Sequence, residues 1–217
     1  MKQKNIQAIK VLLFLLCLSP ALYIGWAAYA NKLGANPIQA MQHLAGLWAF
    51  RFLLITLAVR PLKEVASLSF LMRFRRMLGL YVFFYLVLHL AVYLVLDQYF
   101  NWPAIIKDVI KRPFITVGFA ASILLIPLVV TSTDNMMRRL GKRWKSLHQF
   151  VYLIGILVGL HFLWSVKADV FEPLIYLAIL SLLLLYRLVQ YWKKKYAAFG
   201  LVNIQRGELV ACRRSTL

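Results

Sequence analysis

Apolar runs of about 20 residues recur along this chain of 217 residues, and they constrain its fold more than any other feature. A run of that length can cross a bilayer as one α-helix, which satisfies its own backbone hydrogen bonds inside hydrocarbon. Six such runs can be read, at residues 11–30, 38–59, 77–96, 114–133, 147–166 and 173–191. The sequence therefore predicts an all-α polytopic membrane protein, folded as a bundle of six transmembrane helices.

Composition supports a single membrane domain. Hydrophobic residues make up 62% of the chain and charged residues 15%, and the mean hydropathy is +0.73. Soluble domains are typically about 45–50% apolar and about 25% charged, so a soluble fold is excluded. No stretch is long and polar enough for a separate soluble domain. We expect one transmembrane domain over residues 1–192, followed by a basic tail at 193–217.

The formal net charge of +19 does not indicate nucleic-acid binding, because the basic residues lie between the apolar runs. They would meet anionic lipid head groups there. Lysine and arginine gather before the first run and after the second, fourth and sixth runs, whereas the other connections have fewer of them or balance them with acidic residues. The residues are Lys2, Lys4, Lys10, Arg60, Lys63, Arg73, Arg75, Arg76, Arg138, Arg139, Lys142, Arg143, Lys145, Lys193, Lys194 and Lys195. The positive-inside rule then predicts that both termini are cytosolic.

Two histidines are predicted to lie at one depth. His89 follows Arg76 by 13 residues and His161 follows Lys145 by 16, in two spans that run in the same direction. At 1.5 Å per residue, both lie about 20–24 Å along their helices, in the outer half of the membrane. Two imidazoles at one level can ligate a haem iron from opposite faces, which leaves no open position and suits electron transfer.

Two further polar side chains in the spans need partners. His148 lies near the cytosolic end of the fifth span, about 20 Å along the helix from His161, and its rotation differs by about 140°. Spacing alone therefore supports one haem and not a second. Arg51 lies near the middle of the second span, where an isolated arginine is costly, so we expect a partner anion such as a haem propionate, a flavin or a quinone species.

Residues around the histidine pair have two readings each. Gly155 and Gly159 form a GxxxG pattern, which serves close helix packing or leaves room for a porphyrin. Tyr85, Tyr93 and Trp164 could form aromatic walls beside the histidines or belong to an interfacial aromatic belt. No internal repeat is apparent in the sequence.

Four stretches of the chain resemble the MsrQ family, within the wider group that has a ferric-reductase-like transmembrane domain. They are GANPIQAMQHLAG at 34–46, RFRRMLGLYVFFYLVLHL at 73–90, TSTDNMMRRLGKRWKSLHQFVYL at 131–153 and HFLWSVK at 161–167. The resemblance covers about residues 10–192 and leaves the tail unmatched.

The resemblance implies six membrane helices, haem b, FMN and a place in the inner membrane of a Gram-negative bacterium. It implies that electrons pass from the quinone pool or a cytosolic flavin reductase to MsrP, a periplasmic molybdopterin-containing subunit that reduces methionine sulfoxide in periplasmic proteins. The family's haem-associated histidines correspond to His89, His148 and His161, and haem number and pairing stay open. Arg138 and Arg139, in a basic segment, could bind the FMN phosphate, although basic loops are ordinary on the cytosolic side.

Other functions stay open from the sequence alone. No glycine-rich nucleotide motif is present, so no NAD(P)H domain is encoded. One alternative is a di-haem, quinol-linked cytochrome b that serves another acceptor. Another is a small transporter that uses buried histidine and arginine, which haem content would exclude.

Overall fold

The computed structural model describes residues 3–166 and 170–214, and the side chains at 3–5, 194 and 197–214 lie outside that description. Most of the predicted basic tail, with the connecting residues 167–169, is therefore not described in atomic detail. The chain divides into two compact units, Met1–Leu180 and Ser181–Leu217. Each unit is considered by itself, and the predicted boundary between residues 192 and 193 stays a prediction.

Within the described residues, six helices are long and apolar enough to cross a membrane, as the apolar runs predict. The spans begin and end within a few residues of the predicted bounds, except that the first, second and fifth extend further at one end. They are formed by α1 (Gln3–Tyr29), α2 (Pro37–Val65), α3 (Arg75–Ala91) continued by η2 (Val92–Asp97), α5 (Pro113–Val130), α7 (Lys142–His148) with α8 (Phe150–Ser165), and the first part of α9 (Phe171–Arg214). No strand occurs in the described ranges.

Short helices fill the longer connections, and side-chain caps set where helices begin. The segment η1 (Ser69–Arg73) precedes α3, α4 (Trp102–Lys111) precedes α5, and α6 (Asp134–Leu140) precedes α7. The side chains of Asn36, Asn101 and Thr133 accept hydrogen bonds from backbone N–H groups at the starts of α2, α4 and α6. Gly141, with φ of +49°, separates α6 from α7.

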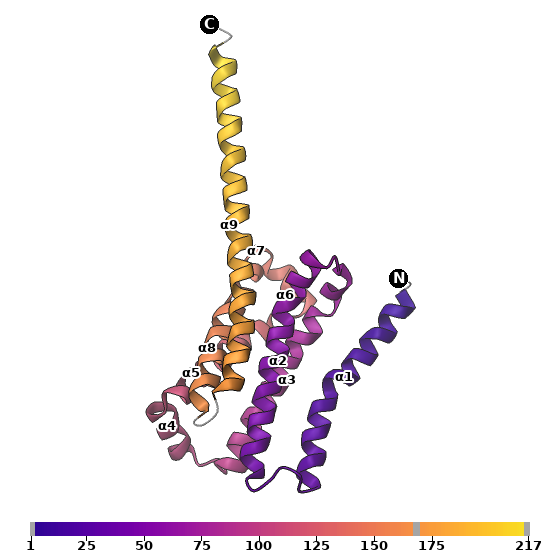
Figure 1. Ribbon diagram of the computed structural model, residues 1–217, viewed down its shortest axis with the longest axis vertical. Helices are drawn as coiled ribbons and strands as arrows, with labels where there is room; N and C mark the ends of the chain where they lie inside the picture. The colour runs from indigo at the N-terminus through magenta and orange to yellow at the C-terminus, as the bar shows by residue number, and fades with distance from the viewer. Residues whose placement is uncertain (1–2, 167–169, 215–217) are drawn as a thin grey trace. The chain divides into compact units, whose positions relative to one another are not determined.

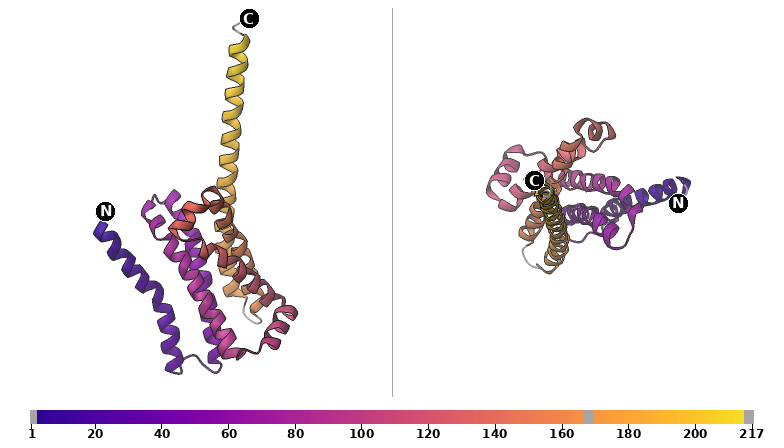
Figure 2. Two further views of the ribbon diagram at one scale, coloured as in Figure 1. Left: turned by 180° about the vertical axis from the view of Figure 1, so that it is seen from behind. Right: turned by 90° about the horizontal axis from the view of Figure 1, so that it is seen from above.

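The core of the first unit is built from two helix pairs (Figure 1). Helix α2 packs along α3, and α5 packs along α8, with far more contact inside each pair than between the pairs. The turned views in Figure 2 agree with this arrangement. The two pairs meet through α3 with α5 and through α2 with α8. We call them the α2–α3 pair and the α5–α8 pair.

Helix α1 lies against the α2–α3 pair and is held there by tyrosine hydroxyls. Pro20 interrupts its backbone hydrogen bonding. The Tyr85 hydroxyl donates to the Cys17 carbonyl oxygen (2.8 Å) and accepts from the Ala21 N–H (3.1 Å), two groups that would bond each other in a regular helix. Tyr81 donates to the Phe14 carbonyl (2.8 Å) one turn earlier. These bonds fix α1 beside the core.

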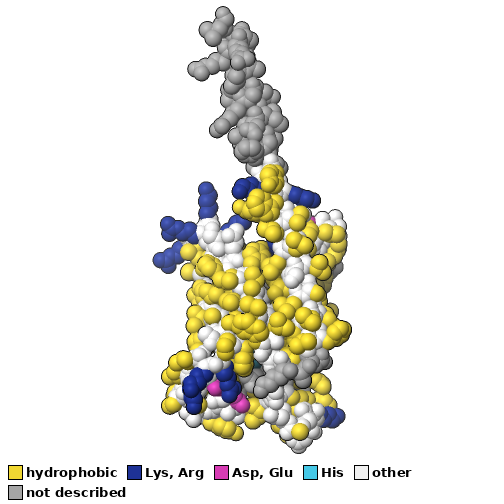
Figure 3. All heavy atoms as spheres, turned by 60° about the vertical axis from the view of Figure 1, so that its left-hand side comes forward, with side chains coloured by type: hydrophobic (Ala, Val, Ile, Leu, Met, Phe, Trp, Pro, Cys, Tyr) yellow, Lys and Arg dark blue, Asp and Glu magenta, His cyan; other side chains and the backbone are white. Residues whose placement is uncertain are grey.

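The two ends of the first unit differ. Connections after α2 and after α5 lie at the same end as the N-terminus, and we call this the basic end; the α1–α2 connection and α4 lie at the other, histidine end (Figure 1). Figure 3 shows hydrophobic side chains over the middle of the bundle, with lysine and arginine above and below them. The side of the membrane that each end faces stays a prediction.

Candidate functional site

Near the histidine end, the fold brings together the two histidines that were matched by depth. His89 comes from α3 and His161 from α8, one from each helix pair. Their ring centres lie 6.3 Å apart, and the ring planes meet at 85°. The site is therefore at the junction of the two pairs, where direct helix contact is sparse.

Each ring is fixed by a hydrogen bond to a backbone carbonyl of the partner helix in its own pair. The Nδ1–H of His89 donates to the Gln42 carbonyl oxygen (2.8 Å), and the Nδ1–H of His161 donates to that of Phe114 (2.7 Å). A carbonyl only accepts, so the proton is on Nδ1 in both rings. The other nitrogen, Nε2, is thereby left with its lone pair as a potential metal ligand.

Two glycines make these bonds possible, and the arrangement repeats. A Cβ on Gly46 would lie 3.0 Å from Nδ1 of His89, and a Cβ on Gly118 would lie 2.6 Å from Nδ1 of His161. In each pair the glycine follows the accepting carbonyl by four residues, and the histidine follows that carbonyl by 47. Every member of the second set lies 72 residues after its counterpart in the first. The structure thus contains a repeat that the sequence does not make apparent.

The spacing suits one metal ion between two imidazoles. Metal–nitrogen bonds of about 2.0 Å, with the ring centres roughly 1.1 Å farther out, place the centres roughly 6 Å apart. The pair lies at that separation. Among the described residues no group of three or more His, Cys, Asp or Glu could hold a bare metal ion. A centre that takes its remaining ligands from its own macrocycle needs only two protein ligands, which is the number of histidines that meet here.

His148 lies elsewhere, at the basic end of the fifth span. Its ring stacks on Trp144 with centres 3.9 Å apart, and its Nδ1–H donates to the Trp144 carbonyl oxygen (3.1 Å). Its Nε2 is buried and makes no hydrogen bond of regular geometry among the described residues. The structure therefore separates His148 from the other pair, as the depth and rotation argument expects.

Arg51 is half-buried in α2 and interacts with aromatic residues. Its Nε–H donates to the Tyr176 hydroxyl (2.7 Å), and its guanidinium carbon lies 4.8 Å from the ring centre of Trp48. No ion pair to Arg51 occurs within the part of the chain that the structure describes. Phe50 and Phe162 link Tyr176 to the helix that carries His161.

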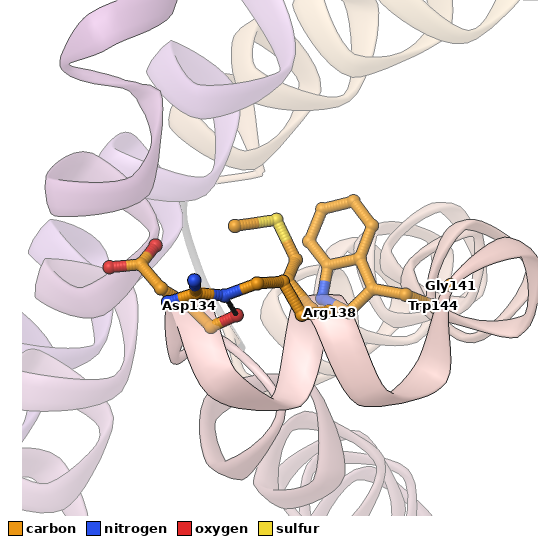
Figure 4. Close-up of a pocket in the computed structure, with 5 residues that line it drawn as sticks. Asp134, Arg138, Gly141 and Trp144 are labelled. Carbon is orange, nitrogen blue, oxygen red and sulfur yellow. Dashed lines mark hydrogen bonds between the residues drawn. The ribbon is translucent and has the colours of Figure 1, made fainter.

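A shallow pocket of about 540 Å³ opens at the basic end, between α6 and α7 (Figure 4). It is lined by Asp134, Met137, Arg138, Gly141 and Trp144. Asp134 pairs with Arg76 of α3 (2.5 Å). Both predicted arginines are exposed; Arg138 lines the pocket and Arg139 does not. Trp144 connects the pocket to His148, because one indole lines the first and stacks on the second.

Comparison with known proteins identifies the chain. Residues 45–160 match the family model described as ferric reductase like transmembrane component. A protein of Xanthomonas euvesicatoria pv. vesicatoria, named protein-methionine-sulfoxide reductase heme-binding subunit MsrQ, is 47% identical over 88% of this chain and 88% of its own length. The chain belongs to the MsrQ family. It is accordingly a multi-pass membrane protein with a ferric-reductase-like transmembrane domain.

Other MsrQ relatives agree. The protein of that name from Rhodospirillum rubrum is 49% identical over 83% of this chain and 87% of its own length. The one from Xanthomonas oryzae pv. oryzae is 48% identical, over 85% and 86%. No solved structure matches the chain significantly. The family model spans both helix pairs, including the positions of Gly46, His89 and Gly118.

In this MsrQ family member, the GxxxG pattern serves helix packing. A Cβ on Gly159 would lie 2.7 Å from a Leu177 methyl group, and a Cβ on Gly155 would lie 3.3 Å from a Leu180 methyl group, both on α9. The space beside these two glycines is therefore occupied by leucine side chains of α9. Tyr85 is fully buried against α1 and α2, and Trp164 is 50% exposed. Tyr85 is therefore accounted for by its packing against α1 and α2, and an aromatic wall formed by Trp164 stays a prediction.

The sequence reasoning overlooked the two carbonyls and two glycines that hold the histidines. A usable indication was present, because Gly46 precedes His89 and Gly118 precedes His161 by the same 43 residues. His43 is the remaining histidine of the four in the chain. It is exposed at the histidine end and its ring lies 6.0 Å from that of Phe162, next to His161 in the chain. It is therefore a nearby histidine that does not belong to the pair.

Proposed function

We propose that the chain is the haem-binding membrane subunit of a protein-methionine-sulfoxide reductase, and that it passes electrons through a haem b held between His89 and His161. The observation that carries the proposal is the histidine pair. Its two rings have fixed Nδ1–H bonds, two Nε2 atoms available as ligands, and a separation suited to one iron. The names of the relatives support the same cofactor.

The residues of this chain would hold and orient the group rather than react. The Gln42 and Phe114 carbonyls keep each proton on Nδ1 and raise the basicity of Nε2. The Phe114 ring lies beside that of His161, and apolar neighbours of this kind would limit the access of water to a bound group. A haem with two histidine ligands supplies one-electron transfer and has no open coordination position.

Arg51 is proposed to bind an anionic group of the cofactor, such as a haem propionate. Tyr176 occupies its Nε–H, which leaves the terminal nitrogens of the guanidinium for a carboxylate. The stacking of Trp48 against the guanidinium supports a fixed orientation for this cation. A quinone or flavin anion would use the same donors.

The direction of electron flow is proposed from the charge pattern and the family. The basic end would face the cytosol, with both termini on that side, in the inner membrane of a Gram-negative bacterium. Electrons would enter there from quinol or a cytosolic flavin reductase, through the region of His148. They would leave at the histidine end to a periplasmic, molybdopterin-containing MsrP subunit, on which methionine sulfoxide would be reduced.

His148 is proposed as a third cofactor-contacting histidine. Its buried Nε2 makes no hydrogen bond of regular geometry among the described residues, although the Leu128 backbone lies near the ring, and a poorly satisfied imidazole nitrogen is costly to bury. Ligation of iron, or contact with an electron-donating group, would satisfy it. The number of haems per chain decides between these roles, and a di-haem cytochrome b is the alternative that this nitrogen favours.

FMN is proposed to bind at the pocket on the basic end. The lining offers a cationic group, Arg138, for a phosphate and an indole, Trp144, beside an isoalloxazine ring. Arg138→Ala should lower the FMN content of the purified protein by about tenfold, because a charge-assisted bond to phosphate is lost. Arg139→Ala is the matched control, since Arg139 adjoins Arg138 but does not line the pocket. Equal FMN loss in both variants would show that only the general charge of the loop matters.

The proposed function is tested by the optical spectrum of the purified protein. The reduced-minus-oxidised difference should show a low-spin b-type haem, with at least one haem per chain. Without oxygen, a catalytic amount of the periplasmic partner together with methionine sulfoxide should reoxidise the reduced protein completely. Methionine sulfoxide alone should not, and the partner alone should take up no more electrons than its own oxidised centre accepts. A chain that holds no haem after expression with ample haem supply would overturn the proposal and favour a transporter.

A further inference from the structure

A carbonyl inside an α-helix is normally shielded from side chains of other helices. The Cα–Cβ bond of each helical residue tilts toward the N-terminus, so the Cβ of residue i+4 leans over the carbonyl of residue i. A slender hydroxyl can still reach such a carbonyl, as Tyr81 reaches that of Phe14, but a broad donor such as an imidazole ring finds more room where residue i+4 has no Cβ. The carbonyl oxygen then accepts two hydrogen bonds, one from the N–H of its own helix and one from the side chain of the other helix.

Both histidines of the pair use this opening. Phe114 and Gly118 stand four residues apart on α5, and His161 bonds the Phe114 carbonyl in the space where a Gly118 side chain would begin. Gln42 and Gly46 give His89 the same opening on α2. A Cβ on Gly118 would lie 2.6, 2.9 and 3.1 Å from three atoms of the His161 ring. Such contacts require the ring itself to move.

The two openings differ in tightness. A Cβ on Gly46 would meet His89 at 3.0 Å from Nδ1 and 3.1 Å from Cε1, which the ring can relieve with a smaller shift. The orientation of each imidazole ring is set by the hydrogen bond from its Nδ1–H to a carbonyl and by its close contact with the glycine, Gly46 or Gly118. The 85° between the planes therefore follows from the two openings together.

We propose that Gly46 and Gly118 are positioning residues for the two haem ligands, that they set the near-perpendicular angle between the imidazole planes, and that Gly118 is the more stringent of the two. The inference rests on the proposed haem site. It assigns a role to residues outside the ligand set and predicts a property of the bound haem, the relative orientation of its two axial rings.

Electron paramagnetic resonance of the oxidised protein is sensitive to the angle between the imidazole planes of His89 and His161. Low-spin ferric haem with nearly perpendicular imidazole planes gives a strongly anisotropic signal dominated by one low-field feature, whereas parallel planes give a rhombic signal with three resolved features. We expect the first form in the wild-type protein. Gly118→Ala should retain about tenfold less low-spin haem, and Gly46→Ala should keep haem but shift the low-field feature and the midpoint potential.

Two variants separate positioning from general crowding. Gly159→Ala places a Cβ 2.7 Å from a Leu177 methyl group, about as tight as the Gly118 contact but against a flexible leucine. It should lower thermal stability and leave the spectrum, potential and resonance signal unchanged. Gly25→Ala, whose added Cβ would have no atom within 4 Å, should change none of these.

The outcomes are distinct from those that test the haem site itself. A wild-type protein that binds no haem would overturn the proposed function. A wild-type protein with low-spin haem and a rhombic signal, or a Gly46→Ala variant whose signal and potential match the wild type, would overturn the positioning role and leave the haem site standing. A Gly118→Ala variant that retains haem at the wild-type level would also overturn the positioning role without affecting the proposed haem site.

Discussion

Replacing His161 with alanine should reduce the low-spin haem of the purified protein by at least about tenfold, and His89→Ala should do the same. Each substitution removes one of the two protein ligands and leaves a carbonyl, of Phe114 or Gln42, with one donor fewer. An iron with one remaining histidine becomes high-spin or is lost. Pyridine haemochrome content and the position of the Soret band measure both effects.

His43→Ala is the matched control for that experiment, because His43 lies at the same end and contacts Phe162 without belonging to the pair. It should keep the wild-type haem content. His148→Ala distinguishes the arrangements that stay open: loss of part of the haem indicates a second haem at the basic end. Loss of all haem in His148→Ala, with retention in His89→Ala, would refute the pairing of His89 with His161.

Replacing Tyr85 with phenylalanine should lower the stability of the folded bundle by about 1–3 kcal/mol. The substitution keeps the fully buried ring but removes the hydroxyl that joins the Cys17 carbonyl and the Ala21 N–H beside Pro20. Both backbone groups are then left without that partner in an apolar environment. The apparent melting temperature of the protein in detergent measures the loss.

Tyr81→Phe is the comparison for Tyr85→Phe, because it removes a single bond to the Phe14 carbonyl. Its effect should be smaller, about 1 kcal/mol. The haem spectrum should be unchanged in both variants, since neither tyrosine contacts the histidine pair. A melting temperature for Tyr85→Phe equal to that of the wild type would show that the hydroxyl does not stabilise α1.

The number of spans and the meeting of His89 with His161 could be predicted from the sequence. Both depend on counting: helix length follows from run length, and depth follows from the distance to a basic residue. The arrangement of helices into the α2–α3 and α5–α8 pairs could not be read in this way. Periodicity gives no reliable face for a helix that is apolar all round.

The residues that hold the histidines illustrate the same limit. Gly46 and Gly118 matter because of what lies opposite them on another helix, and a single sequence does not show which helices are neighbours. Gly155 and Gly159 form a GxxxG pattern that is visible in the sequence, and they pack against leucines of α9. The contact of Trp144 with His148 follows from their i, i+4 spacing, whereas the place of Trp144 in the pocket depends on the turn between α6 and α7 at Gly141.

The sparse contact between the two helix pairs has a consequence for how the protein matures. Each pair is a hairpin-like unit that forms its own extensive contacts, whereas the junction between pairs is where the proposed haem would lie. Haem insertion would then be the step that joins two preformed halves. We expect chains made under haem starvation to be digested by protease between the halves, in the segment from η2 to α4, and haem supply to protect them.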